Sequence, residues 1–253
     1  RRQRQMCIRD SAERARAAAP PGNPLKIAWE MLGRDAETRS FFLFIFIAIL
    51  AIFLQDNILE VFGAEAFGMS VAETTHFQPT WGGGVLMGMV LMGIASSVRP
   101  ISKRSIVVCG CIGTAVAMAA LAATSVLGLR DGVLPSLMAV GLFTGVFNVG
   151  ALSLMMEMTV PEATGLYMGL WGTSQTLAQG VASVGSGALH AALIGTGWLT
   201  PAAAYGVIFG MEAAGLLVAA ALVLRVSSRR FRETRMAPLS RTDLTRAMGV
   251  TAT

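Results

Sequence analysis

The sequence predicts an all-α membrane protein that crosses the bilayer six times. Of its 253 residues, 54% are hydrophobic and only 14% are charged, whereas a soluble domain carries about a quarter charged residues. The apolar residues gather in long uncharged runs such as Phe41–Leu54 and Ile106–Leu129. A membrane-spanning helix needs ~20 mostly apolar residues. Six stretches meet this requirement: about 40–62, 76–98, 104–128, 132–158, 163–193 and 200–225.

The basic residues are distributed asymmetrically between the two sides of these spans. Of the 20 Lys and Arg residues, Arg130 alone falls between spans three and four, and the other 19 fall on the opposite side. Because positively charged loops stay in the cytoplasm, we expect both termini on the cytoplasmic side of the membrane. This topology explains the basic tails without a nucleic-acid partner. The other side carries the acids Asp56, Glu60, Glu65, Glu73 and Asp131.

Three regions follow from this reading. Residues 1–39 form a cytoplasmic tail or linker, 40–226 form the helical bundle, and 227–253 form a basic cytoplasmic tail. Within the first region, Pro24–Arg39 is predicted to be a short amphipathic segment, whose apolar side is Leu25, Ile27, Trp29 and Leu32. Met6–Ser11 (MCIRDS) resembles translated adapter sequence, so we expect residues 1–11 not to belong to the natural protein.

Several helix starts and contacts are marked locally. Ser70–Glu73 and Thr159–Glu162 have the pattern of capping boxes, and Asp131 can cap the fourth span, since acids are favoured at helix N-termini. Glycines four residues apart let membrane helices approach closely. Such pairs predict a compact bundle and occur in four different spans: Gly84/Gly88, Gly141/Gly145, Gly165/Gly169 and Gly206/Gly210.

The starts of the second and fifth spans are similar to each other. With one residue of slack, four positions correspond: Glu73 with Glu162, Thr75 with Thr164, Trp81 with Trp171, and Gly82 with Gly172. These spans start on opposite sides of the membrane, as an inverted 3+3 repeat requires; chance similarity between Gly-rich helices is the alternative. Six spans in such a repeat make half of a twelve-helix major-facilitator fold. We expect the C-terminal half, with an N-terminal six-helix half as its partner.

Polar residues at membrane depth are candidate functional residues. Gln55, Asp56, Asn57 and Glu60 lie near the outer end of the first span. On a helix, Asp56 and Glu60 would share a face, and the pair would need water, a proton or a cation such as Arg130. The alternative is that the helix simply emerges into the interface here. Glu212, deep in the sixth span, needs a proton or a partner.

Two longer segments carry a family resemblance. Phe53–Val71 (FLQDNILEVFGAEAFGMSV), followed by AETT, and Glu162–Gly180 (EATGLYMGLWGTSQTLAQG) resemble the PucC-type family of major-facilitator membrane proteins. The resemblance implies a protein of the bacterial inner (intracytoplasmic photosynthetic) membrane that assembles light-harvesting complexes. It implies antenna polypeptides and pigment-synthesis enzymes as partners. It also implies bacteriochlorophyll or chlorophyll as a carried ligand rather than a prosthetic group.

A chlorin ligand suggests a second set of candidate residues. A neutral imidazole can bind the magnesium of a chlorin, so His190 and then His76 are candidate ligands. Trp81 and Trp171 adjoin glycines that leave a flat apolar face. Gln175 and Gln179 lie one turn apart on the fifth span. The alternatives are polar residues at the interface and ordinary helix packing.

Three function classes remain to be weighed. The first is an assembly factor that binds or delivers bacteriochlorophyll to antenna polypeptides. The alternative is a major-facilitator secondary transporter of a small solute; against it, the loop Ser96–Ser105 lacks the acid of the usual transporter motif. An enzyme is not expected, because the sequence has no clustered aspartates to hold Mg²⁺, no nucleophile triad and no metal-ligand spacing.

Overall fold

The computed structural model describes residue 33, residues 36–159 and 164–195, residue 197 and residues 199–226. In these residues the protein is helical. The order is α3 (Ala36–Phe53), α4 (Leu59–Phe67), α5 (Val71–Thr74), α6 (Phe77–Val98), α7 (Lys103–Leu127), η1 (Arg130–Gly132), α8 (Val133–Glu157), α9 (Thr164–Gly195) and α10 (Pro201–Arg225). The tails and most of the expected amphipathic segment lie outside the described residues, so the three predicted regions stay a prediction.

Six segments are long and apolar enough to cross a membrane, which confirms the predicted number of spans. Five predicted spans agree with α6, α7, α8, α9 and α10 to within about two residues at each end. The first does not. Residues 40–62 were expected to form one helix, but α3 ends at Phe53 and α4 begins at Leu59.

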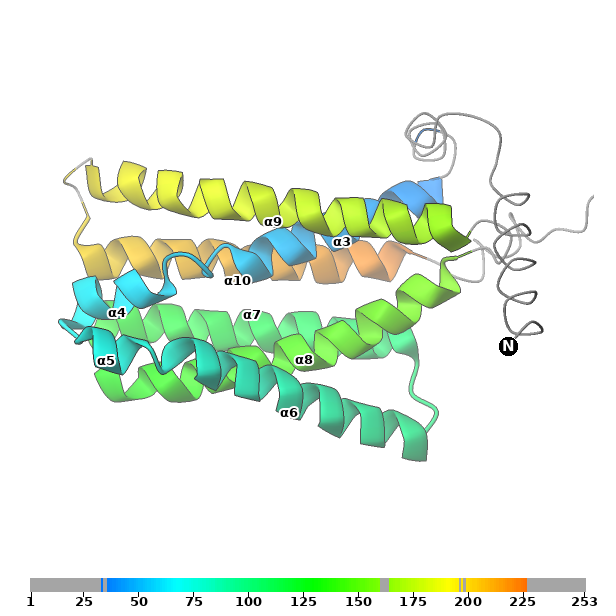
Figure 1. The fold of residues 1–253 in the computed structure, drawn as a ribbon, viewed down its shortest axis with the longest axis horizontal. Helices are drawn as coiled ribbons and strands as arrows, with labels where there is room; N and C mark the ends of the chain where they lie inside the picture. The colour runs from blue at the N-terminus through cyan, green and yellow to red at the C-terminus, as the bar shows by residue number, and fades with distance from the viewer. Residues whose placement is uncertain (1–32, 34–35, 160–163, 196, 198, 227–253) are drawn as a thin grey trace, which may run out of the picture.

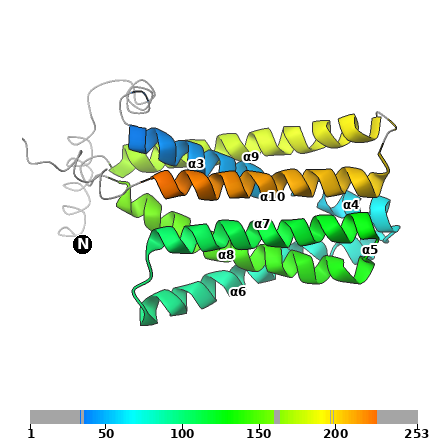
Figure 2. The same ribbon diagram turned by 180° about the vertical axis from the view of Figure 1, so that it is seen from behind.

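The long helices form a row in which each packs on the next. α6 packs on α8, α8 on α7, α7 on α10, α10 on α3 and α3 on α9. Figures 1 and 2 show the six long helices lying side by side. The short helices α4 and α5 lie at one end of the bundle, measured along the helix axes. α6 and α9 stand at the two outer edges and bury least, 11% and 17% of their span residues against 44–56% for the others.

Hydrogen bonds fix the register of the antiparallel pair α7 and α10. At one end the Arg104 side chain donates to the Val223 carbonyl (3.0 Å). At the other, the Ser125 hydroxyl donates to the Ala202 carbonyl (2.6 Å). An ion pair between Lys103 and Glu157 joins the start of α7 to the end of α8. The loop Ser96–Ser105 contains no acidic residue. The acid that pairs with its Lys103 is Glu157 of α8.

Glycines make the crossing of α6 and α8 close. A Cβ on Gly84 would lie 2.5 Å from the Met138 carbonyl oxygen, and one on Gly88 only 2.0 Å from that of Leu142. On α8, Gly141 and Gly145 meet the backbone of α6 in the same way. Two of the four predicted glycine pairs are therefore confirmed as close contacts.

The helix-start predictions have mixed outcomes. The Ser70 box is confirmed: Glu73 Oε2 accepts hydrogen bonds from the Ser70 backbone N–H and hydroxyl, both at 2.9 Å. It opens the short α5 rather than the long α6. The Asp131 cap is wrong, because the N-cap of α8 is Gly132, which the chain reaches through η1. The box at Thr159–Glu162 falls largely outside the described residues.

Candidate functional site

The first span is interrupted by a polar break at Leu54–Ile58. Its backbone makes tighter turns than an α-helix: Asp56 N–H donates to the Phe53 carbonyl (3.2 Å), and Ile58 N–H donates to that of Gln55 (3.0 Å). Asp and Asn side chains compete for backbone hydrogen bonds and favour turns over helix interiors. The consecutive Gln55, Asp56 and Asn57 therefore end the helix within an otherwise apolar run.

The side chains of the break reach two other helices. Asp56 Oδ1 accepts a hydrogen bond from Gln78 Nε2 on α6 (3.0 Å). Asn57 Nδ2 donates to the Ser183 carbonyl on α9 (3.3 Å). α6 and α9 are the two outer helices of the row, so the break ties together elements that do not pack on each other. Irregular backbone at membrane depth is found where it is buried in protein or lines a cavity.

Two of the predicted polar residues, Gln55 and Glu212, have side-chain oxygens that are buried without a hydrogen-bond partner in the described residues. Gln55 is 3% exposed and Glu212 is 1% exposed. In the described part of the chain, the Oε1 atom of Gln55 and both carboxyl oxygens of Glu212 accept no hydrogen bond. An unsatisfied buried polar group costs about 1–3 kcal/mol. Trp81 Nε1, Trp171 Nε1 and Thr144 Oγ1 are likewise buried without a hydrogen-bond partner among the residues that the structure describes.

The expected pairing of Arg130 with Asp56 or Glu60 is wrong. Arg130 forms an ion pair with Glu73 of the capping box instead, which joins η1 to α5. Glu60 lies exposed in the first turn of α4, where the helix dipole favours an acid. Asp56 belongs to the break, so the two acids do not lie one turn apart on a continuous helix.

A second polar cluster lies near the α4 end of the bundle and involves His190. Glu65 Oε2 is hydrogen-bonded to His190 Nε2 (3.0 Å) and accepts from the Tyr205 hydroxyl (2.9 Å). The His190 and Tyr205 rings lie 4.9 Å apart. The cluster links α4, α9 and α10. Glu65 and Tyr205 were not among the predicted site residues, since no local pattern joins positions so far apart in sequence.

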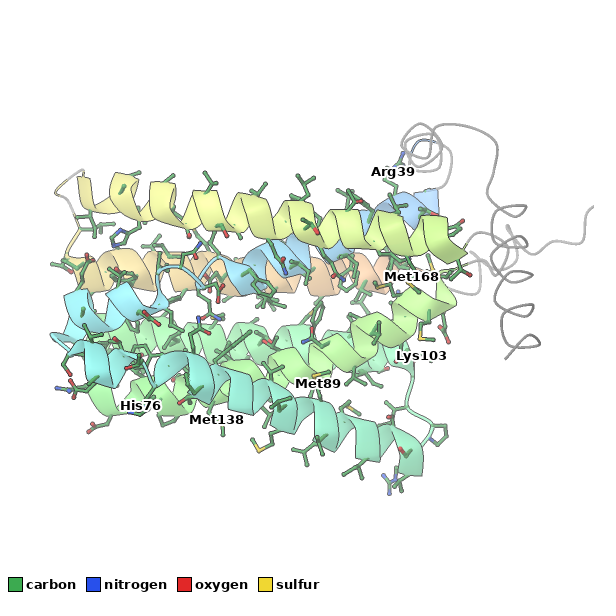
Figure 3. The ribbon with its side chains drawn as sticks, viewed as in Figure 1. Arg39, His76, Met89, Lys103, Met138 and Met168 are labelled. Carbon is green, nitrogen blue, oxygen red and sulfur yellow. The ribbon has the colours of Figure 1, made fainter. Side chains whose placement is uncertain are left out.

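The remaining predicted pigment-binding residues lie in different environments. His76 is exposed just before α6, at the α5 end of the bundle (Figure 3). Trp81 packs against Phe53 at the end of α3, with ring centroids 6.5 Å apart. Trp171 is fully buried against Phe41 (4.7 Å) at the start of the same helix. Gln175 is half-buried and Gln179 is exposed on α9.

An open groove runs along the exposed face of α9. Its volume is about 930 Å³, and its lining residues all belong to that helix: Gly172, Thr173, Thr176, Leu177, Gly180, Val181, Val184 and Gly185. The hydroxyls of Thr173 and Thr176 donate to carbonyls of their own helix, at 2.8 and 3.0 Å. Because these hydroxyl hydrogens are already bonded within the helix, they need no hydrogen-bond partner on a ligand. The groove is therefore essentially apolar.

Basic side chains mark one end of the described bundle. Arg39, Arg99, Lys103, Arg104 and Arg225 lie at helix ends on that side, where Figure 3 labels Arg39 and Lys103. Arg130 is the one described cation at the other end. Across the described residues, no three His, Cys, Asp or Glu side chains gather as a metal site.

The fold and site together define a polytopic α-helical membrane protein whose first span is broken by polar residues. A family model described as "PUCC protein" matches residues 5–231, and the chain belongs to this PucC family. It is 36% identical over 203 residues, 78% of the chain, to the "Bacteriochlorophyll synthase 44.5 kDa chain" of Rhodobacter capsulatus. It is 33% identical over 177 residues, 68% of the chain, to "Protein PucC" of Cereibacter sphaeroides.

The matched part is less than half of each relative. The chain spans 46% of the Rhodobacter capsulatus protein and 38% of the Cereibacter sphaeroides protein. Family membership and the six apolar helices make it a multi-pass protein of the photosynthetic bacterial membrane.

Proposed function

We propose that this protein helps to assemble light-harvesting complexes by binding bacteriochlorophyll or chlorophyll and delivering it to antenna polypeptides. Membership of the PucC family and the pigment named in one relative support this proposal. The structural observation that carries it is the groove on α9. Three glycines, Gly172, Gly180 and Gly185, leave a flat strip on an exposed helix face, and a flat macrocycle with an apolar tail has matching chemistry.

The mode of action we propose is binding rather than catalysis. The pigment is a carried ligand and no prosthetic group is required. Antenna polypeptides and pigment-synthesis enzymes are the proposed partners. A second six-helix half, in a major-facilitator arrangement, is the proposed intramolecular partner. The basic end of the bundle, with both termini, is proposed to face the cytoplasm.

His190 is the proposed magnesium ligand, with His76 the second candidate. A carboxylate bonded to one imidazole nitrogen orients the ring and raises the basicity of the other nitrogen, an arrangement common at metal-binding histidines. With its Nε2–H donated to Glu65, His190 would present the lone pair of Nδ1. His190 is not one of the groove-lining residues, although both belong to α9. We therefore treat the ligand and the groove as separate determinants of binding.

Replacing the imidazole tests this assignment. In full-length protein purified in mild detergent, we expect near-infrared absorbance of bound bacteriochlorophyll, and we expect His190→Ala to lower it several-fold. Glu65→Gln, which keeps the hydrogen-bonding shape and removes the charge, is the matched variant and should lower it less. Unchanged pigment in His190→Ala, with protein of normal stability, would remove His190 from the site.

Deleting the gene separates assembly from synthesis. We expect fewer antenna complexes while free bacteriochlorophyll is still made. A strain that no longer makes the pigment at all would indicate an enzyme instead, and the proposed function would fail.

One observation favours the alternative, a major-facilitator secondary transporter of a small solute. Discontinuous membrane helices hold the substrate and ion sites of many transporters, and Leu54–Ile58 is such a discontinuity. Proton-driven uptake of a water-soluble compound into vesicles containing the protein would favour this reading. In that case, disruption of the break should abolish the uptake.

A further inference from the structure

Gln55 lies in the polar break and Glu212 on α10, and both have buried oxygens that accept no hydrogen bond in the described part of the chain. Their burial is nearly complete, at 3% and 1% exposed. The three unbonded oxygens are Gln55 Oε1 and the two carboxyl oxygens of Glu212. All three are hydrogen-bond acceptors when the carboxyl is ionised. The contacts of α10 with α3 and α4 indicate at which level of the bundle each of the two side chains lies.

One face of α10 packs first on α4 and then on α3. Near its start, the rings of Tyr205 and Phe209 lie 5.2 and 5.0 Å from that of Phe62 on α4. Further along, a Cβ on Gly215 would lie 3.1 Å from the Cβ of Ala51 on α3. Glu212 lies seven residues after Tyr205 and three before Gly215, positions that share one helix face. Its carboxyl therefore belongs to the face that covers the junction of α3 and α4.

The same helix geometry places Gln55 opposite Glu212. Gln55 follows Ala51 by four residues, one helical turn toward α4. Because α3 and α10 are antiparallel, one turn onward from Ala51 and one turn back from Gly215 reach the same level. The polar break and Glu212 thus lie at the same level of the bundle, where α3 ends.

The surroundings at this level supply no cation. The described cations, Arg39, Arg99, Lys103, Arg104, Arg130 and Arg225, lie at helix ends. The titratable groups on the elements that pack against α10 are few. On α7 they are Cys109 and Cys111; on α4, Glu60 and Glu65; on α9, Tyr167 and His190; on α3, Glu37 and Arg39 at its far end. A buried charge without a partner is strongly unfavourable.

We propose that Glu212 binds a proton at neutral pH and shares it with Gln55. The carboxylic acid O–H donates to Gln55 Oε1, so that one hydrogen satisfies both groups. With Gln55 Oε1 turned toward the carboxyl, both facing atoms are acceptors, and the proton on Glu212 supplies the hydrogen between them. Donation from Gln55 Nε2–H to an ionised carboxylate would instead leave the charge buried without a cation. The pair is a proton-binding site that joins α10 to the polar break. Loss of the proton would leave a charged carboxylate in the apolar bundle and release the break from α10. This site is separate from the proposed pigment groove.

Infrared difference spectroscopy of full-length protein in lipid nanodiscs tests the site. A buried carboxylic acid gives a carbonyl stretch that is distinct from a carboxylate and sensitive to hydrogen bonding. We expect this band at neutral pH in the wild type, its loss in Glu212→Gln, and its shift to higher frequency in Gln55→Leu. Glu65→Gln is the matched control and should leave the band unchanged. Glu212→Gln keeps the side-chain shape, so the protein should remain folded.

Three results would overturn the proposal. Absence of the band in the wild type would mean that Glu212 is ionised. A band at the same frequency in Gln55→Leu would mean that the two residues do not pair. Loss of the wild-type band on addition of sodium ions would assign the site to a metal cation instead. Pigment binding is measured separately by absorbance, so failure of either proposal is visible without the other.

Discussion

The two outer helices of the row, α6 and α9, use glycine in opposite ways. On α6, Gly84 and Gly88 press against the backbone of α8, with Leu142 oxygen only 2.0 Å from the position of a Cβ on Gly88. On α9, nothing lies within 4 Å of the corresponding positions of Gly165, Gly169, Gly172 and Gly180. The same spacing therefore closes one helix pair and leaves the other helix open.

The difference shows what the glycine spacing does and does not specify. Missing side chains permit a close approach, but the neighbouring helix decides whether it happens. α8 offers Gly141 and Gly145 in register with the glycines of α6. α3, the neighbour of α9, offers large residues such as Phe41 on the contact. Of these glycines of α9, Gly172 and Gly180 line the groove.

The largest expected effect comes from filling the α6–α8 contact. Gly88→Leu places a branched side chain where even a Cβ clashes with backbone, which cannot move aside cheaply. We expect no monodisperse folded protein by size-exclusion chromatography in detergent. Gly93→Leu is the matched control on the same helix, because nothing lies within 4 Å of its Cβ position. If both variants behave alike, the close contact does not hold the bundle together.

The tryptophans of the two outer helices, Trp81 on α6 and Trp171 on α9, give the next largest effect. Trp171 is fully buried, so Trp171→Ala should destabilise the protein by about 3–5 kcal/mol. Trp81 is only half-buried, and Trp81→Ala should cost clearly less. Thermal unfolding followed by fluorescence of the remaining tryptophans ranks the two. Equal losses would mean that the two ends of α3 are equally packed.

The smallest expected effect concerns Gly→Ala substitutions on the two helices, which should change the free energy of unfolding in opposite directions. Gly88→Ala should destabilise by about 1–3 kcal/mol because it overpacks a closed contact. Gly180→Ala meets open space and gains helix propensity, so it should stabilise by roughly 0.5–1 kcal/mol. Denaturant titration in the same detergent measures both. A destabilising Gly180→Ala would show that the groove is occupied by protein.

Much of the fold was predictable from the sequence because hydrocarbon thickness sets span length directly. The spans, the Ser70 box and the glycines at 84, 88, 141 and 145 rest on local signals. The break at Leu54–Ile58 did not emerge, since the apolar run up to Leu54 favoured one continuous helix. Its signal was the run Gln55-Asp56-Asn57, which was singled out as polar but read as helical.

The candidate site was less predictable, because its partners are remote in sequence. His190 was singled out without Glu65, which lies 125 residues away. Arg130 was assigned to the wrong acids, since charge alone cannot rank partners on one side of a membrane. The inverted repeat and the pigment-binding residues stay predictions.

The length of α9 has a consequence for how a ligand arrives. Its 32 residues extend ~48 Å at ~1.5 Å per residue, well beyond the ~30 Å of hydrocarbon. The helix must tilt, or its ends must enter the headgroup layers. Gly172–Gly185, near its middle, then lies at the depth of the acyl chains. A lipophilic molecule would reach this strip by lateral diffusion within the membrane, without an aqueous step.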